Sequence, residues 1–191
     1  MTAAAPDAAC LLAELRRWIA ASWDPELSLA RWRELLADAG WACPAWPRGW
    51  CGRSLPASLA AQVTQELAGA GVPGPAEGVG VGLAGPVLIE HGTDALRERF
   101  VRPTVTGEIT WCQLFSEPGA GSDLAGLTTR AEAVADGWLV TGQKVWSTGA
   151  ATADFGLLLA RTDASVPSTA ALPALCCRCA SRVSRRARCG R

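Results

Sequence analysis

Apolar residues recur every three or four positions through much of the first hundred residues, as they do on the buried face of amphipathic helices. A connector rich in Gly, Pro and Trp at 40–50 interrupts this pattern, and the Pro-Gly-Pro sequence at 73–75 interrupts it again. Thr93 has the side chain and the position of an N-cap for the helix that follows it. We therefore predict that residues 8–106 are mainly helical. The expected helices cover 11–19, 29–36, 56–68, 79–90 and 94–100.

The period of the apolar positions changes near Gly107. Beyond this glycine the apolar stretches are short, and several alternate with polar residues or contain β-branched side chains, as strands do. The pattern predicts an α+β fold in which an N-terminal α-helical domain is followed by an antiparallel β unit. The expected strands cover 109–115, 128–135, 138–141 and 155–161.

The composition is that of a globular protein, since 49% of the residues are hydrophobic and 19% are charged. No apolar run reaches the roughly eighteen residues that suggest a membrane span, so we expect none. The first residues include Asp7 and no basic residue, which argues against a secretory signal. A cytoplasmic location is the resulting expectation.

Three features that often mark functional sites have simpler explanations in this chain. The G-x-G-x-x-G pattern at 80–85 is not preceded by a strand, so close helix packing explains it better than dinucleotide binding. His91, the only histidine, is followed by Gly92 and Thr93, which indicates the end of a helix. Cys112 lies in an apolar stretch, where a free thiol usually packs in the core.

Two segments carry residues suited to a ligand. The first, 113–123, ends in a turn of small residues, where backbone N–H groups can approach a ligand closely. The second, 142–150, offers the flat indole of Trp146 followed by two hydroxyl side chains. Together they suit a flat, heteroatom-rich ring that carries a phosphate tail.

These segments resemble the flavin-binding signatures of the acyl-CoA dehydrogenase family, in the same order and about thirty residues apart. The resemblance implies an N-terminal helical domain over 1–107 and the start of an incomplete antiparallel β-barrel-like middle domain over 108–167. It also implies a missing C-terminal domain, because members of the family are much longer. The expected cofactor is FAD, and the expected reaction is α,β-dehydrogenation of an acyl-CoA thioester in fatty acid β-oxidation.

The resemblance also assigns roles to single residues. Ser122 is expected to contact the acyl-CoA substrate as well as the flavin. No catalytic residue is assigned, because the family's glutamate base lies in the later helical domain, and no metal site is expected. The expected FAD-binding residues are Gln113, Leu114, Phe115, Ser116, Gly121, Ser122, Trp146, Ser147 and Thr148.

A full-length relative is expected to form homo-oligomers and to pass electrons to an electron-transfer flavoprotein. The chain alone is expected to be inactive. Two alternatives stay open: half of an acyl-CoA oxidase, which passes electrons to oxygen, and a non-enzymatic pseudogene remnant. Retention of flavin would distinguish an assembled site from such a remnant.

Residues 168–191 differ in composition from the rest of the chain. They contain six arginines and four cysteines but no acidic residue, so the formal net charge of zero combines an acidic body with a basic tail. A zinc site is disfavoured because Cys176 and Cys177 are adjacent, which departs from the usual ligand spacing. A nucleic-acid-binding arm is supported by charge alone, and we expect no nucleic-acid partner.

We favour a third interpretation, in which 168–191 is an out-of-frame, disordered tail. The chain has a single lysine and neither Asn nor Tyr, as a GC-rich gene would produce. Such genes yield Arg, Ala, Pro, Cys and Ser when the frame is shifted. One nucleotide inserted before the codon for Ser168, with suitable third codon bases, gives a sequence that resembles the continuation of the family's β-domain.

Overall fold

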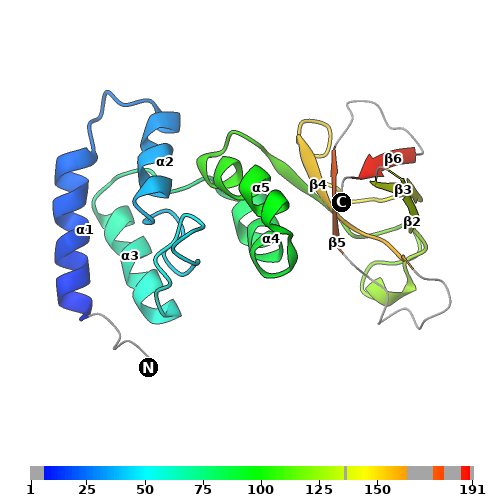
Figure 1. The fold of residues 1–191 in the computed structure, drawn as a ribbon, viewed down its shortest axis with the longest axis horizontal. Helices are drawn as coiled ribbons and strands as arrows, with labels where there is room; N and C mark the ends of the chain where they lie inside the picture. The colour runs from blue at the N-terminus through cyan, green and yellow to red at the C-terminus, as the bar shows by residue number, and fades with distance from the viewer. Residues whose placement is uncertain (1–6, 136, 163–173, 179–185, 190–191) are drawn as a thin grey trace. The chain divides into compact units, whose positions relative to one another are not determined.

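The computed structural model describes residues 7–135, 137–162, 174–178 and 186–189 (Figure 1). The chain divides into two compact units, Met1–Glu108 and Ile109–Arg191. We call them the helical unit and the β unit. The division falls beside the change of apolar period near Gly107.

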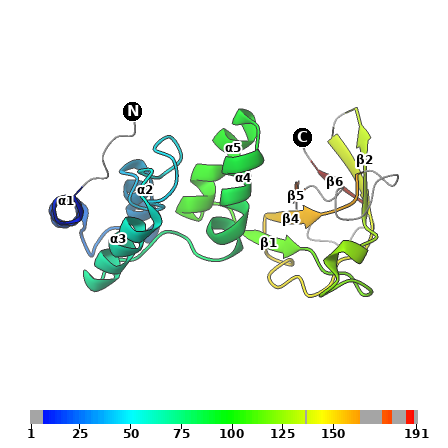
Figure 2. The ribbon, with the colours of Figure 1, turned by 90° about the horizontal axis from the view of Figure 1, so that it is seen from below.

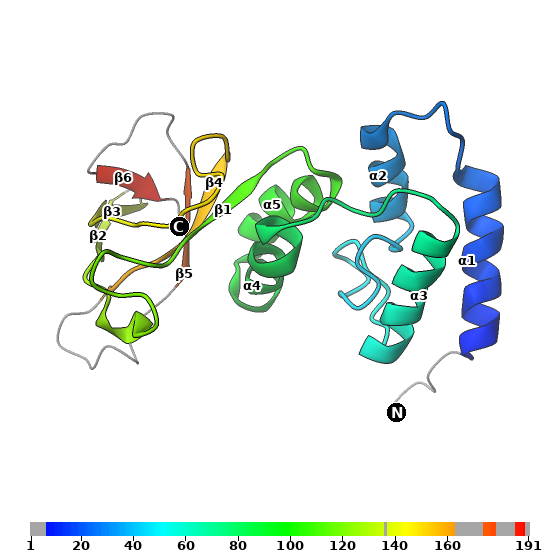
Figure 3. The same ribbon diagram turned by 180° about the vertical axis from the view of Figure 1, so that it is seen from behind.

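The helical unit contains a helix in each region where the sequence predicts one. The views in Figures 1 and 3 show α1 beside α3, and α4 beside α5. None of the described helices is long and apolar enough to span a membrane. The elements are α1 (Ala8–Ser22), α2 (Leu29–Asp38), α3 (Ala57–Gly69), a π-helical turn (Gly80–Ala84), α4 (Gly85–His91) and α5 (Asp94–Thr106).

Capping side chains mark where helices begin. Thr93 accepts a hydrogen bond at Oγ1 from the N–H of Leu96, which confirms it as the N-cap of α5. Ser28 accepts the equivalent bond from the N–H of Arg31 at the start of α2. Each bond gives a partner to one of the N–H groups that the first helical turn leaves unpaired.

Helix α5 is longer than the sequence predicts and ends at Gly107 rather than near Phe100. Pro103 lacks a backbone N–H and usually ends a helix. Here Thr104 and Val105 are buried, and Thr104 Oγ1 donates a hydrogen bond of 2.6 Å to the carbonyl oxygen of Phe100. Burial of this turn offsets the lost backbone bond, and Gly107 then ends the helix with a left-handed φ of 83°.

Tryptophans form the centre of the helical unit. The ring centroids of Trp18 and Trp23 lie 5.3 Å and 4.8 Å from that of Trp32, which is fully buried. Trp32 Nε1 donates a hydrogen bond of 2.7 Å to the carbonyl oxygen of Pro73, so its polar atom is satisfied. Trp32 is a buried member of the apolar core of this unit, and the partly buried Trp18 packs against that core.

The glycine-rich stretch at 80–85 packs closely, as expected. Gly85 begins α4 against the indole of Trp46, and a Cβ on this glycine would overlap the ring. His91 is the last residue of α4 and is exposed, which confirms that it marks a helix end.

The β unit contains one sheet with the strand order β1-β4-β5-β6-β3-β2. Helices followed by a sheet confirm the predicted α+β class. The described strands form no closed barrel, which is compatible with an incomplete domain. The strands are β1 (Trp111–Leu114), β2 (Arg130–Val134), β3 (Gly137–Thr141), β4 (Phe155–Leu159), β5 (Ala174–Arg178) and β6 (Arg186–Cys189).

One pair of strands departs from the antiparallel arrangement. β1 and β4 run in parallel, with Trp111 opposite Phe155, whereas the other strand pairs are antiparallel (Figure 2). A parallel pair needs a long connection, and the segment that contains β2 and β3 supplies it. The period of apolar residues cannot reveal this difference, because it is the same in both kinds of pair.

Among the described residues, the packed apolar cluster of the β unit is small. Its buried members are Ala131, Val140, Leu158 and Ala160, and the half-buried Trp138 packs against them. Cys112, on β1, is fully buried, as the sequence predicts for a packed thiol.

Two parts of the expected disordered tail form strands. β5 pairs with β4, and β6 pairs with β3. These pairings give hydrogen-bond partners to backbone groups of β4 and β3 that would otherwise lie at a sheet edge. Composition does not predict this, because strand pairing uses backbone groups that every residue except proline has in full. The rest of 168–191 lies outside the described residues. The out-of-frame interpretation and the domain limits stay predictions.

Candidate functional site

Two loops of the β unit carry most of the predicted site residues. The Gly-rich loop (116–123) follows β1, and the Trp loop (142–150) follows β3. The backbone N–H of Val145 donates a hydrogen bond of 2.9 Å to the carbonyl oxygen of Ser116, which joins the two loops. The structure therefore brings together two segments that are separate in the sequence.

The Gly-rich loop begins with a tight turn. Glu117 and Ala120 exchange two backbone hydrogen bonds, of 2.8 Å and 3.1 Å. No described atom lies within 4 Å of the position that a Cβ would take on Gly119 or Gly121. The backbone is thus open to a ligand at these glycines.

A buried ion pair joins the loops a second time. Lys144 Nζ lies 3.0 Å from Glu117 Oε1, and the two side chains are 8% and 5% exposed. Lys144 Nζ also donates a hydrogen bond of 2.8 Å to the carbonyl oxygen of Phe115. Glu117 further accepts bonds from the N–H and hydroxyl of Thr128 and from the N–H of Thr129. We call Glu117, Lys144 and Thr128 the clasp.

The environment of Glu117 controls its protonation. Desolvation by burial is the largest single influence on the pKa of Glu117 and would raise it. The hydrogen bonds from the 128–129 segment and from Lys144 together outweigh desolvation and lower the pKa to about 2. Desolvation lowers the pKa of Lys144, and the bond to Glu117 counteracts this. Glu117 is therefore ionised at neutral pH and is a weak proton acceptor, so it serves structure rather than base catalysis.

Trp146 stands out among the described side chains because it is a large apolar group that is 91% exposed. Its backbone has a φ of 57°, in the left-handed region, which a bulky residue adopts at a cost of roughly 1–2 kcal/mol. The preceding residue, Val145, is bonded to Ser116, so the Gly-rich loop holds the chain at this point. An exposed indole on a strained backbone contributes little to packing, and the combination indicates a ligand-binding position.

The predicted site residues differ in exposure. Phe115 and Ser116 bond to the Trp loop through their backbone carbonyl oxygens. The exposed members of the predicted set are Gln113, Gly121, Ser122, Trp146 and Thr148, and the half-buried members are Leu114, Phe115, Ser116 and Ser147.

The clasp is not predicted from the sequence. One signal was present, because Lys144 is the only lysine of the chain and lies two residues before Trp146. The positions of Glu117 and Thr128 in the same cluster depend on how the loops fold, and their spacing in the sequence does not show it.

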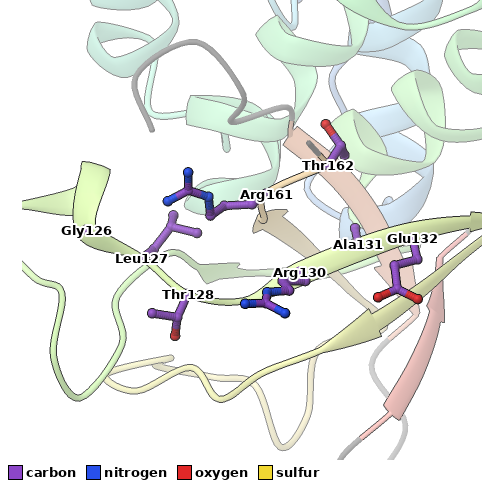
Figure 4. A pocket seen from close by; sticks show the side chains of 8 residues that line it. All are labelled: Gly126, Leu127, Thr128, Arg130, Ala131, Glu132, Arg161 and Thr162. Atoms are coloured by element: carbon purple, nitrogen blue, oxygen red, sulfur yellow. The ribbon is translucent and has the colours of Figure 1, made fainter. Parts of the chain in front are cut away.

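Two cavities share Gly126 and Thr128, which follow the Gly-rich loop in the sequence. The smaller, of about 300 Å³, is lined by Glu117, Pro118, Gly119, Gly126, Thr128 and Gln143. The larger, of about 430 Å³, is lined by Gly126, Leu127, Thr128, Arg130, Ala131, Glu132, Arg161 and Thr162 (Figure 4). Within the described part of the chain, no three or more His, Cys, Asp or Glu side chains gather as a metal site would require.

Comparison with known proteins connects this geometry to a family. The model of the acyl-CoA dehydrogenase N-terminal domain matches residues 9–108, and that of the middle domain matches residues 112–175, which include both loops. The acyl-CoA dehydrogenase FadE34 of Mycobacterium tuberculosis is 50% identical over 132 residues, which are 69% of this chain and 18% of that protein.

Solved structures have the same fold. The ChsE4-ChsE5 complex from Mycobacterium tuberculosis is 27% identical with a TM-score of 0.62, over 93% of this chain and 48% of that one. The Tcur3481-Tcur3483 steroid ACAD is 29% identical with a TM-score of 0.62, over 88% and 47%. The chain thus spans less than half the length of each of these three relatives. With family models matched across both of its units, the chain belongs to the acyl-CoA dehydrogenase family.

Proposed function

We propose that this chain forms the flavin-facing and substrate-facing surface of an FAD-dependent acyl-CoA dehydrogenase. The observation that carries the proposal is Trp146, an exposed indole on a left-handed backbone. It directly follows Val145, whose backbone N–H donates a hydrogen bond to the carbonyl oxygen of Ser116. The buried ion pair of the clasp holds the same two loops together. Membership of the family supports the chemistry, since its members are named for the dehydrogenation of acyl-CoA.

The residues present fit a flavin. The indole of Trp146 offers a flat apolar face, and the open backbone at Gly119 and Gly121 permits close approach of a polar group. We propose that the hydroxyls of Ser116 and Thr148 bind polar atoms of the ring. The remaining proposed contacts come from Gln113, Leu114, Phe115, Ser122 and Ser147.

Bound FAD would accept a hydride from the β-carbon of the thioester. Ser122 is the residue of this chain that we propose contacts the acyl-CoA. Holding the thioester against the flavin ring would supply the alignment on which transfer depends. Glu117 does not remove the α-proton, because its carboxylate is committed to the clasp. We propose that the base comes from another part of the assembled enzyme, in which an electron-transfer flavoprotein and further copies of the enzyme are partners.

The proposal is tested by titrating FAD with the 191-residue chain and following quenching of flavin fluorescence. We expect saturable binding that weakens about tenfold or more in Trp146→Ala, because loss of a stacked aromatic group removes about 1–3 kcal/mol. Trp146→Phe keeps a flat ring and should retain most of the affinity. Val134→Ala, at another exposed apolar residue of the β unit, is the matched control and should bind as the wild type does.

Equal affinity of the wild type and Trp146→Ala for FAD would contradict the assigned site. The chain alone should not bleach the flavin when acyl-CoA is added, because loss of a general base lowers the rate by roughly 10²–10⁴. Rapid, substrate-dependent bleaching would show that a carboxylate of this chain serves as the base.

A further inference from the structure

Arg130 and Arg161 are held at neighbouring positions on the edge of the larger cavity. They form an isolated parallel bridge in which the N–H of Ala131 donates to the carbonyl oxygen of Arg161, at 2.8 Å. The N–H of Arg161 donates to the carbonyl oxygen of Thr129, also at 2.8 Å. Residues that face each other across a bridge project their side chains from the same face. Both arginines line the cavity, and Figure 4 shows their side chains extending toward Leu127 and Thr128.

Among the described residues that line the cavity, two side chains are cationic and one is anionic. Like charges at directly opposed positions destabilise a sheet. Glu132, two residues beyond Arg130 on β2, is the carboxylate among the lining residues and offsets one of the two charges. Arg161 makes another interaction within the chain, and its side chain also lines the cavity.

We propose that Arg130 and Arg161 bind a phosphate group of a nucleotide ligand in this cavity. The planar guanidinium fork matches phosphate oxygens in geometry and charge. The volume of about 430 Å³ lies within the range of small-molecule sites. Gly126 and Thr128 also line the cavity beside Glu117, so the phosphate site adjoins the Gly-rich loop. The identity of the nucleotide rests on the proposed function, since both coenzyme A and FAD carry phosphates.

The direct test uses nucleotides without a flavin or acyl group. Adenosine 3′,5′-bisphosphate, ADP and adenosine are titrated calorimetrically into the 191-residue chain at low salt. We expect both phosphorylated nucleotides to bind more tightly than adenosine. Arg130→Gln and Arg161→Gln should each weaken binding of the phosphorylated nucleotides about tenfold, as expected for loss of a charged hydrogen bond. Binding should also weaken as salt is added.

Three control variants separate charge at the cavity from general effects. Glu132→Gln removes the negative charge and should tighten nucleotide binding. Arg130→Lys retains the charge and should restore part of the affinity lost in Arg130→Gln. Arg17→Gln makes the same change of charge at an exposed position of α1 and should have no effect. Circular dichroism verifies that each variant is folded.

Two further comparisons identify the source of the phosphate. If the site takes coenzyme A, the arginine variants lower the preference for coenzyme A over pantetheine and leave the preference for FAD over riboflavin unchanged. If it takes the flavin's pyrophosphate, the opposite result is expected. Equal affinity for adenosine and its phosphorylated forms would overturn the phosphate site, as would full nucleotide affinity in folded Arg130→Gln and Arg161→Gln. If the chain does not bind flavin but still binds phosphorylated nucleotides through the two arginines, the proposed function is wrong and the phosphate site stands.

Discussion

In the helical unit large indole side chains pack against one another, whereas the β unit has a small buried apolar cluster and, in its loops, a buried pair of opposite charges. Trp32 and Trp41 are both fully buried, and the apolar cluster around them draws on α1, α2 and α3. The buried cluster of the β unit is made of two alanines, a valine and a leucine. Beside the proposed site, the Glu117–Lys144 pair occupies the interior in place of apolar groups.

The two units therefore differ in what stabilises them and in what fixes the geometry of their side chains. Apolar burial contributes in proportion to the area removed from water, whatever the details of the contact. A buried ion pair contributes less net stability, because removing both charges from water offsets their attraction. The pair does, however, require one geometry, in which Lys144, Thr128 and Thr129 all donate hydrogen bonds to the carboxylate of Glu117. The loops that carry the proposed site are therefore held in one arrangement by the clasp.

The comparison predicts that the largest loss of stability comes from the helical core. Trp32→Ala removes the indole around which Trp18 and Trp23 pack, and should destabilise this unit by about 3–5 kcal/mol. Hydrogen exchange measured by mass spectrometry should show lost protection across 8–106. Trp146→Ala removes the same side chain from an exposed position and should change stability by about 0.5 kcal/mol or less. Similar losses in both variants would contradict the comparison.

The second-largest loss of stability is expected when the ion pair of the clasp is broken. Lys144→Met leaves Glu117 buried without its cation and should cost toward the lower end of about 3–5 kcal/mol, because Thr128 and Thr129 still donate to the carboxylate. Exchange should accelerate in both loops, and FAD affinity should fall with it. A double-mutant cycle with Glu117→Gln should show coupling between the two positions. Additive effects would mean that the two side chains act independently.

Acid should weaken the β unit selectively through the same carboxylate. The folded-state pKa of Glu117 is about 2, below its ordinary value near 4.5, so the group stabilises the folded state above the higher value. This contribution, on the order of 3 kcal/mol, is lost as the pH falls from about 4.5 through about 2, roughly half of it by pH 3. Glu117→Gln should flatten that part of the pH profile of hydrogen exchange in the loops. An unchanged profile in this variant would assign the acid sensitivity to other groups.

The smallest effect is expected at an exposed ion pair. Arg16 and Glu66 join α1 to α3 by two hydrogen bonds, of 2.6 Å and 2.8 Å. The Arg16 side chain is 62% exposed, so water and salt screen the attraction. Arg16→Met is the matched partner of Lys144→Met and should shift the melting temperature little, least of all at high salt. A shift as large as that of Lys144→Met would show that burial does not distinguish the two pairs.

Much of the fold could be predicted from periodicity. The helices and the first four strands lie where apolar spacing places them, because that spacing records which face of an element is buried. The extension of α5 past Pro103 was not predicted. Proline usually ends a helix, and the sequence does not show that Thr104 and Val105 are buried and stabilise this turn. The strands β5 and β6 were not predicted, because their pairing with β4 and β3 uses backbone groups that the composition of 168–191 does not reveal.

For the site, the order of residues along the chain is enough to show which chemical groups are present and that they resemble flavin-binding signatures. The small residues of the Gly-rich loop and the hydroxyls that follow Trp146 are local features, readable in order along the chain. The sequence does not show that Glu117 and Lys144 form a buried pair or that Arg130 and Arg161 are opposed across a bridge. Both pairs become visible in the folded chain. Electrostatic interactions depend on distance and solvent exposure in three dimensions, and these are set when separate loops and strands meet.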